Sequence, residues 1–114
     1  MLSPEILKGT IKPLILKLIS EEGRMYGYQI TRRVELLTAG ELVLTEGALY
    51  PALHKLVKEG LLKVETGRTA NRERKYYSLS DDGRRVTVEK LRETRDTILT
   101  LARLFDLQPA PYGA

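Results

Sequence analysis

The sequence predicts a mainly α-helical fold with one small β-hairpin, and three observations support this prediction. Apolar residues recur at helical spacing in four stretches, over residues 3–23, 26–39, 45–59 and 81–106. Between the third and fourth stretches, over residues 62–79, the period falls from 3.6 to 2, which is typical of paired strands. The chain has 114 residues and no cysteine. We therefore expect one domain whose core forms without disulfides.

The first helix is expected to begin at Ser3, a capping hydroxyl followed by a proline at the first helical position. Gly23 ends it. Pro13 lies inside the helix, which should therefore kink or begin in two pieces. Its apolar residues at helical spacing are Leu7, Ile11, Leu14, Ile15 and Leu18.

The second helix, residues 26–39, places Ile30, Val34 and Leu37 on one face. The third helix is expected to begin after the N-cap Thr45 and to end before Gly60. Its buried residues should be Leu49, Leu53, Leu56 and Val57.

Two strands should follow, joined by a basic turn at residues 67–72. Ser80 is an N-cap for the last helix, residues 81–106. This helix carries a seam of heptad type, formed by Leu91, Thr94, Ile98, Leu101 and Phe105. We expect residues 107–114 to be a disordered tail.

The net charge of +4 is unevenly distributed along the chain. Residues 45–79 hold seven Lys and Arg against four Asp and Glu, whereas residues 80–114 hold six of each. A charged loop facing solvent would explain this, and so would an element that contacts phosphates. The order of helices and hairpin favours the second explanation, because it is that of a winged helix–turn–helix. In that arrangement the third helix enters the DNA major groove and the hairpin tip reaches the flanking backbone or minor groove.

Four stretches, in this order and at these intervals, carry a more specific resemblance: Tyr26-Gly27-Tyr28-Gln29-Ile30, then Gly47-Ala48-Leu49-Tyr50-Pro51-Ala52-Leu53 through Leu56, then Glu59-Gly60-Leu61-Leu62, and Arg74-Lys75-Tyr76-Tyr77-Ser78-Leu79-Ser80 with Gly83. Over residues 5–106 the chain resembles the PadR family of bacterial transcriptional regulators. Its length resembles the short class of that family. The resemblance implies a winged helix–turn–helix domain over residues 1–80 and a C-terminal dimerisation helix over residues 81–106.

The candidate DNA-contacting residues occupy the polar face of the third helix, the start of the second helix, the hairpin tip and the strand after it. A solvated helix face is the alternative interpretation of the first group. Tyr26 is expected in the core. The candidates are Tyr28, Arg32, Gly47, Tyr50, Pro51, His54, Lys55, Lys58, Arg68, Thr69, Asn71, Arg72, Arg74 and Lys75.

The seam of the last helix could pack on the first helix of the same subunit or on a second copy. Members of the short class pair through these two helices, and a two-fold dimer would place two recognition helices about one DNA turn apart. Some members bind flat aromatic drugs with a tryptophan, which this chain lacks. A small-molecule effector therefore remains an unidentified candidate partner. The candidate dimer residues are Leu7, Ile11, Leu91, Thr94, Ile98, Leu101 and Phe105.

Several classes of function are disfavoured. One histidine and no cysteine argue against a transition-metal site. The sequence contains neither a pairing of histidine with a nucleophile nor a glycine-rich phosphate loop. We therefore expect neither an enzyme nor a bound cofactor. No stretch longer than eight residues lacks charge, so we expect no membrane span and a cytoplasmic protein.

The sequence therefore predicts a DNA-binding transcriptional regulator. We expect a repressor that binds a palindromic operator as a homodimer, through helix 45–59 and the basic wing 67–73. The alternative is a winged-helix module that binds a protein or a small molecule without acting on DNA.

Overall fold

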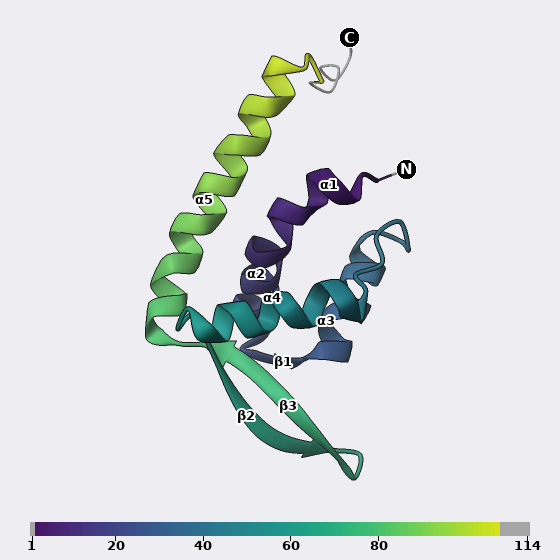
Figure 1. Ribbon diagram of the computed structural model, residues 1–114, viewed down its shortest axis with the longest axis vertical. Coiled ribbons are helices and arrows are strands. Elements are labelled where there is room, and N and C mark those ends of the chain that lie inside the picture. Colours follow the sequence, from purple (N-terminus) through teal and green to yellow (C-terminus); the bar gives the residue numbers. More distant parts are fainter. Residues whose placement is uncertain (1, 108–114) are drawn as a thin grey trace.

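Three helices pack around one core, from which a hairpin and a long helix project in opposite directions (Figure 1). The computed structural model describes residues 2–107 and measures 54 × 30 × 26 Å. The elements in chain order are α1 (Pro4–Leu7), the 3₁₀ turn η1 (Lys8–Thr10), α2 (Ile11–Glu22), β1 (Arg24–Tyr26), α3 (Gly27–Leu37), α4 (Glu46–Lys58), β2 (Leu62–Thr69), β3 (Arg72–Leu79) and α5 (Asp81–Leu104). No helix within residues 2–107 is both long and apolar enough to cross a membrane.

The first predicted helix forms in two pieces, α1 and α2, separated by the turn η1. Ser3 caps α1, because its Oγ accepts a hydrogen bond from the Ile6 N–H at 3.4 Å. Pro13 is the third residue of α2. N–H groups in the first turn of a helix have no intrahelical partner, so a proline there costs no hydrogen bond.

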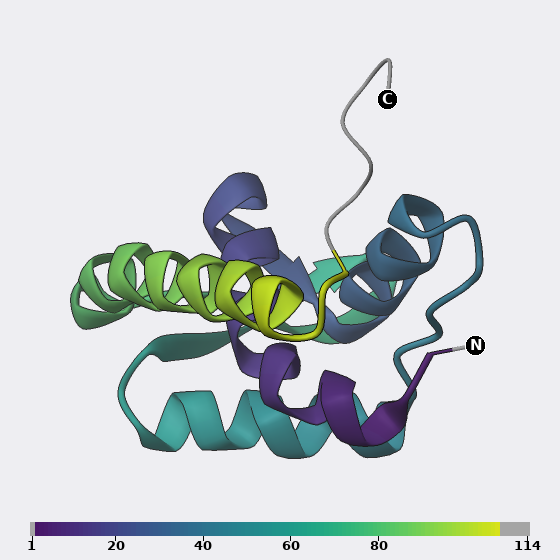
Figure 2. The same cartoon turned by 90° about the horizontal axis from the view of Figure 1, so that it is seen from above.

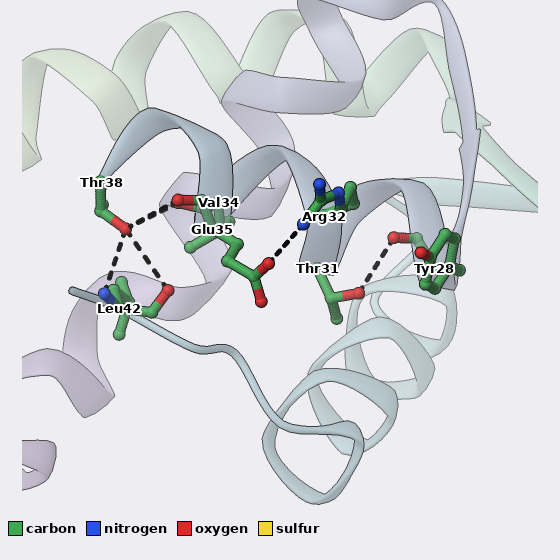
Figure 3. A network of polar contacts seen from close by, with 7 residues as sticks. All are labelled: Tyr28, Thr31, Arg32, Val34, Glu35, Thr38 and Leu42. Carbon is green, nitrogen blue, oxygen red and sulfur yellow. Dashed lines mark hydrogen bonds and ion pairs between the residues drawn. The ribbon is translucent and has the colours of Figure 1, made fainter. Parts of the chain in front are cut away.

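The turn between α3 and α4 is fixed by one threonine side chain (Figure 3). The Thr38 hydroxyl donates to the Val34 carbonyl at 2.9 Å and accepts from the Leu42 N–H at 3.0 Å. Ala39 and Gly40 both adopt positive φ. Helix α3 therefore ends at Leu37, two residues before the predicted end. The rigid turn sets the angle at which α4 leaves α3.

Helix α4 has the predicted start and end. The Thr45 Oγ1 accepts from the Ala48 N–H at 3.2 Å, and Gly60 follows the helix with a φ of +80°. Both features match their predicted roles of N-cap and C′ glycine. The buried face of α4 consists of Leu49, Leu53 and Leu56.

The predicted hairpin is confirmed as β2 and β3, and the sheet differs from the expectation in two respects. The sheet has three strands in the order β1-β3-β2, because the three-residue β1 pairs with β3. Strands β2 and β3 also extend further than expected, from Leu62↔Leu79 to Thr69↔Arg72. The turn contains only Ala70 and Asn71, both at positive φ, instead of residues 67–72. Such two-residue turns match the right-handed twist of the strands they join.

The core lies between α2, α3, α4 and the inner face of the sheet. In β3, Tyr77 and Leu79 alternate with outward-facing residues, and both are buried. Tyr76, which points to the outer face, is nevertheless only 6% exposed. The fully buried residues of largest volume are Ile15, Leu16, Leu18, Ile19, Ile30, Val34, Leu49, Leu53 and Leu56.

The seam of α5 divides into a covered half and an open half. Helices α2 and α5 are in contact, and on α5 Leu91 and Thr94 are partly buried. Further along, Ile98 is 52% exposed, Leu101 44% and Phe105 67%. The open half of α5 and the short α1 lie on the same side of the core (Figures 1 and 2). Of the predicted tail, residues 108–114 lie outside the described residues.

Candidate nucleic-acid interface

A hollow of about 510 Å³ separates the helices from the hairpin. Its walls are the start of α3, the first half of α4 and the beginning of β3. Strand β1 ends at Tyr26, opposite Tyr76, and the chain then turns into α3. The edge of β3 before Tyr76 is therefore not paired to β1, and it borders the hollow.

Helix α4 is seated against the start of α3 by Tyr50. A side chain on Gly27 would bring its Cβ within 2.8 Å of the Tyr50 Cζ, and nearer still to the hydroxyl. Only glycine at this position lets the tyrosine ring lie over the first turn of α3. The Tyr50 hydroxyl is therefore held at the hollow, where Tyr28 projects with 64% of its surface exposed.

Basic side chains are neutralised on some elements and not on others. Those of α2, α3 and most of α5 pair with carboxylates, as in Lys17–Glu21 at 2.9 Å and Arg85–Asp82 at 2.9 Å. In α4 and the hairpin, by contrast, none of the seven basic side chains has a carboxylate within 4.0 Å among residues 2–107. These are Lys55, Lys58, Lys63, Arg68, Arg72, Arg74 and Lys75.

Five of the predicted DNA-contacting residues line the hollow: Tyr28, Tyr50, Arg72, Arg74 and Lys75. Arg68, Thr69 and Asn71 lie at the hairpin tip. There the Arg68 Nη2 donates to the Asn71 carbonyl at 3.4 Å, and the Thr69 hydroxyl is hydrogen-bonded to Tyr76.

The other predicted residues lie elsewhere. On α3, Arg32 pairs with Glu35 at 2.5 Å (Figure 3), so its charge is locally neutralised. Gly47, Pro51 and Lys55 line a separate cavity of about 740 Å³, between α4, the start of α2 and α5. The two sides of α4 therefore face different surroundings. His54 stands beside Tyr50, with 6.4 Å between the ring centroids, and Lys58 is exposed near the end of α4.

Seven residues at the hollow were not among the predicted DNA contacts: Tyr26, Gly27, Thr31, Glu46, Leu49, Glu73 and Tyr77. Tyr26 was expected in the core and is only partly buried, because it lies on the outer face of the sheet. The signal that could have placed it is the pair of tyrosines at 26 and 28 around a helix-starting glycine. The two glutamates reduce the positive charge at the rim of the hollow.

Tyr77 forms part of the wall between the hollow and the core. Burial, and to a smaller extent the nearby Tyr50 hydroxyl, raises the pKa of Tyr77. The phenol therefore stays neutral at physiological pH. In the described residues, no three histidine or acidic side chains converge as metal ligands do.

The order of helices α3 and α4 followed by the β2–β3 hairpin defines a winged helix–turn–helix fold, in which the hairpin is the wing. Comparison with known proteins gives the family. Residues 15–89 match the family described as "Transcriptional regulator PadR-like family". The chain therefore belongs to the PadR-like family of transcriptional regulators. As predicted, it is a DNA-binding regulator and not an enzyme.

Individual relatives agree. A transcriptional regulator from Clostridium thermocellum is 28% identical, with a TM-score of 0.79 over 90% of this chain and 97% of that one. PadR of Bacillus subtilis, solved in complex with operator DNA, is 29% identical, with a TM-score of 0.62 over 71% of this chain and 46% of that one. An uncharacterized protein of Lysinibacillus sphaericus, protein X, is 29% identical over 82% of this chain and 85% of its own length.

Proposed function

We propose that the protein represses transcription by binding a palindromic operator as a homodimer. The observation that carries this proposal is the set of basic side chains without carboxylate partners on α4 and the wing, five of which belong to β2 and β3. The similarity to PadR of Bacillus subtilis, which was solved in complex with operator DNA, supports the same conclusion.

The hollow supports a docking geometry in which α4 enters the major groove. Tyr28 and Tyr50 present phenol groups from α3 and α4, and Arg72 and Lys75 present cations from β3. Phosphate contacts of this kind fix the register of a protein on the duplex, and side chains of the recognition helix then read base edges. On α4, His54 and Tyr50 are neighbours on the exposed surface and suit that second role.

The open half of α5 supports the homodimer. Ile98, Leu101 and Phe105 are about half or more exposed in the protomer, on a helix about 36 Å long. An apolar groove of about 560 Å³ lies between α1, the start of α2 and the α3–α4 turn, with Leu7 and Ile11 in its wall. A two-fold pairing would cover both apolar surfaces and space the two α4 helices for successive major grooves. Repression would follow from occlusion of a promoter.

The test is fluorescence anisotropy with labelled DNA from directly upstream of the protein's own gene, beside a scrambled duplex, over a range of salt concentrations. We expect tight binding of two subunits to the upstream DNA only. The variant Arg68→Ala/Arg72→Ala should bind both duplexes more weakly. The logarithm of the binding constant falls with the logarithm of the salt concentration, and this slope should be smaller for the variant. The decrease should be about 0.9 for each phosphate that the variant no longer neutralises, or up to about 3.6 for a dimer.

A matched control removes the same charge from another place. Arg84→Ala/Arg85→Ala also deletes two arginines, but each of these pairs with an aspartate at the start of α5. Its slope should equal that of the wild type. Equal effects of the two double variants would show that net charge, and not the wing, governs binding. Failure of the wild type to bind either duplex at low salt would favour the alternative module that does not act on DNA.

A further inference from the structure

On the outer face of the sheet, four side chains from β1 and β3 form a continuous stack that ends at the hollow. The Arg24 Cζ lies 4.1 Å from the ring centroid of Tyr76. Tyr76 meets Tyr26 edge to face, with 5.4 Å between centroids and 85° between planes. The Arg74 Cζ in turn lies 4.3 Å from the centroid of Tyr26. Contacts of both kinds, aromatic and cation–π, have favourable geometry.

Strand register and one glycine produce this stack. Tyr26 and Tyr76 are directly opposite each other in the β1–β3 ladder, so their side chains share a face. On the other side of β3, a Cβ at Gly67 would lie 2.7 Å from the Tyr76 Cε2. The missing side chain at Gly67 therefore leaves the space that the Tyr76 ring occupies, and Tyr76 supports Tyr26.

The two ends of the stack differ in charge balance. Arg24 forms an ion pair with Glu65 of β2, with 3.5 Å between the Arg24 Nη1 and the Glu65 Oε1. Arg74 has no carboxylate within 4.0 Å among residues 2–107, and its buried Nε has no hydrogen-bond partner there. Removing part of a cation from water without a counter-charge is unfavourable. The uncompensated arginine is the one that lines the hollow, beside Tyr28 and Tyr50.

We propose that Tyr26 is a positioning residue that holds the Arg74 guanidinium in place to bind one phosphate of the DNA backbone. This inference rests on the proposed function, because it assigns a ligand within the same interface. Stacking on an aromatic ring occupies a face of the guanidinium and leaves its edge N–H groups free. Those groups form a planar fork that matches two phosphate oxygens. The phosphate would supply the missing counter-charge.

The first part of the test compares the two ends of the stack in the anisotropy assay. Arg74→Ala should weaken binding to the upstream and scrambled duplexes alike, by about tenfold or more, because it removes a charged hydrogen bond. Its salt slope should fall by about 0.9 per protomer, or about 1.8 for a dimer. Arg24→Ala is the matched control, since it also removes a stacked arginine, and it should leave the slope unchanged. Equal effects of the two variants would refute the assignment.

The second part measures the coupling between Tyr26 and Arg74. Tyr26→Phe keeps the ring and should retain wild-type binding, whereas Tyr26→Leu should reduce affinity about as much as Arg74→Ala does. In the double variant the two reductions should not add, because both substitutions remove the same interaction with phosphate. A general loss of structure at position 26 would instead give additive reductions, together with a lower melting temperature, and would overturn the proposal.

These outcomes separate the two proposals. If the wild type binds DNA and the reductions in affinity add, Tyr26 does not position Arg74 but the regulator still acts through α4 and the wing. If the wild type binds no DNA at any salt concentration, the proposed function fails and the phosphate assignment fails with it.

Discussion

Ile98→Asp tests whether the open half of α5 is the dimer contact. Ile98 keeps 52% of its surface exposed in the protomer. Full burial of such a side chain is worth about 1.5–3 kcal/mol, so covering the exposed half contributes about 1 kcal/mol per copy. A two-fold interface contains the residue twice, which makes about 2 kcal/mol. The variant lacks this contribution and places two carboxylates in the interface, so the dissociation constant should rise at least about 30-fold.

The neighbouring residue provides the control. Leu99 is 50% exposed on the same turn of α5, but it lies about 100° around the helix from Ile98 and outside the seam. Leu99→Asp should therefore dimerise as the wild type does. Sedimentation equilibrium at several protein concentrations gives both constants, and circular dichroism shows whether each variant is folded. If the two variants dimerise equally well, or are equally impaired, the seam does not form the interface.

Two further predictions concern stability and its pH dependence. Gly83→Ala should lower the free energy of unfolding by about 2–4 kcal/mol in urea titrations, because its Cβ would lie 2.9 Å from the Leu61 carbonyl carbon, which cannot move easily. Gly47→Ala, which has only a distant neighbour at 3.9 Å, should not be destabilising. The raised pKa of Tyr77 means that the folded state holds this proton more tightly than the unfolded state does. The stabilisation from this group should be complete below about pH 10 and should decline above it, so Tyr77→Phe should show a shallower decline above about pH 10 in the same titrations. Parallel pH curves would contradict the burial of Tyr77.

The helices were predictable because each carries its own local signals. Ser3, Thr45 and Ser80 all cap the helices for which they were predicted, and Gly60 follows α4 as expected. Apolar spacing also identified the buried face of α4. These signals depend on neighbours within four residues, which a single sequence displays directly.

The sheet was less predictable because its pairing connects distant residues. Strand β1 has three residues and no period of its own, and it exists only because β3 lies beside it. Gly67 indicates a turn locally, but in the fold it is a strand residue beside the Tyr76 ring. The stack on the outer face depends on the same long-range register. Burial of Tyr76 therefore could not follow from alternation, which assigns that face to solvent.

The site residues were predicted as one set, and the structure divides them between two sides of α4. Tyr50 faces the wing and is seated on Gly27, whereas Pro51 and Lys55 face the start of α2 and α5. Helix α4 is thus a wall of both the hollow proposed to bind DNA and the cavity near the proposed dimer contact. Within the protomer, α4 already packs on α2, α3 and β2, and Gly27 and the Thr38 turn fix its position at the hollow. Dimerisation should therefore not be needed to shape the interface, and a folded Ile98→Asp monomer should still bind a half-site weakly, with about half the salt slope of the wild-type dimer on a full operator. A monomer with no affinity for DNA would show instead that the partner subunit completes the binding surface.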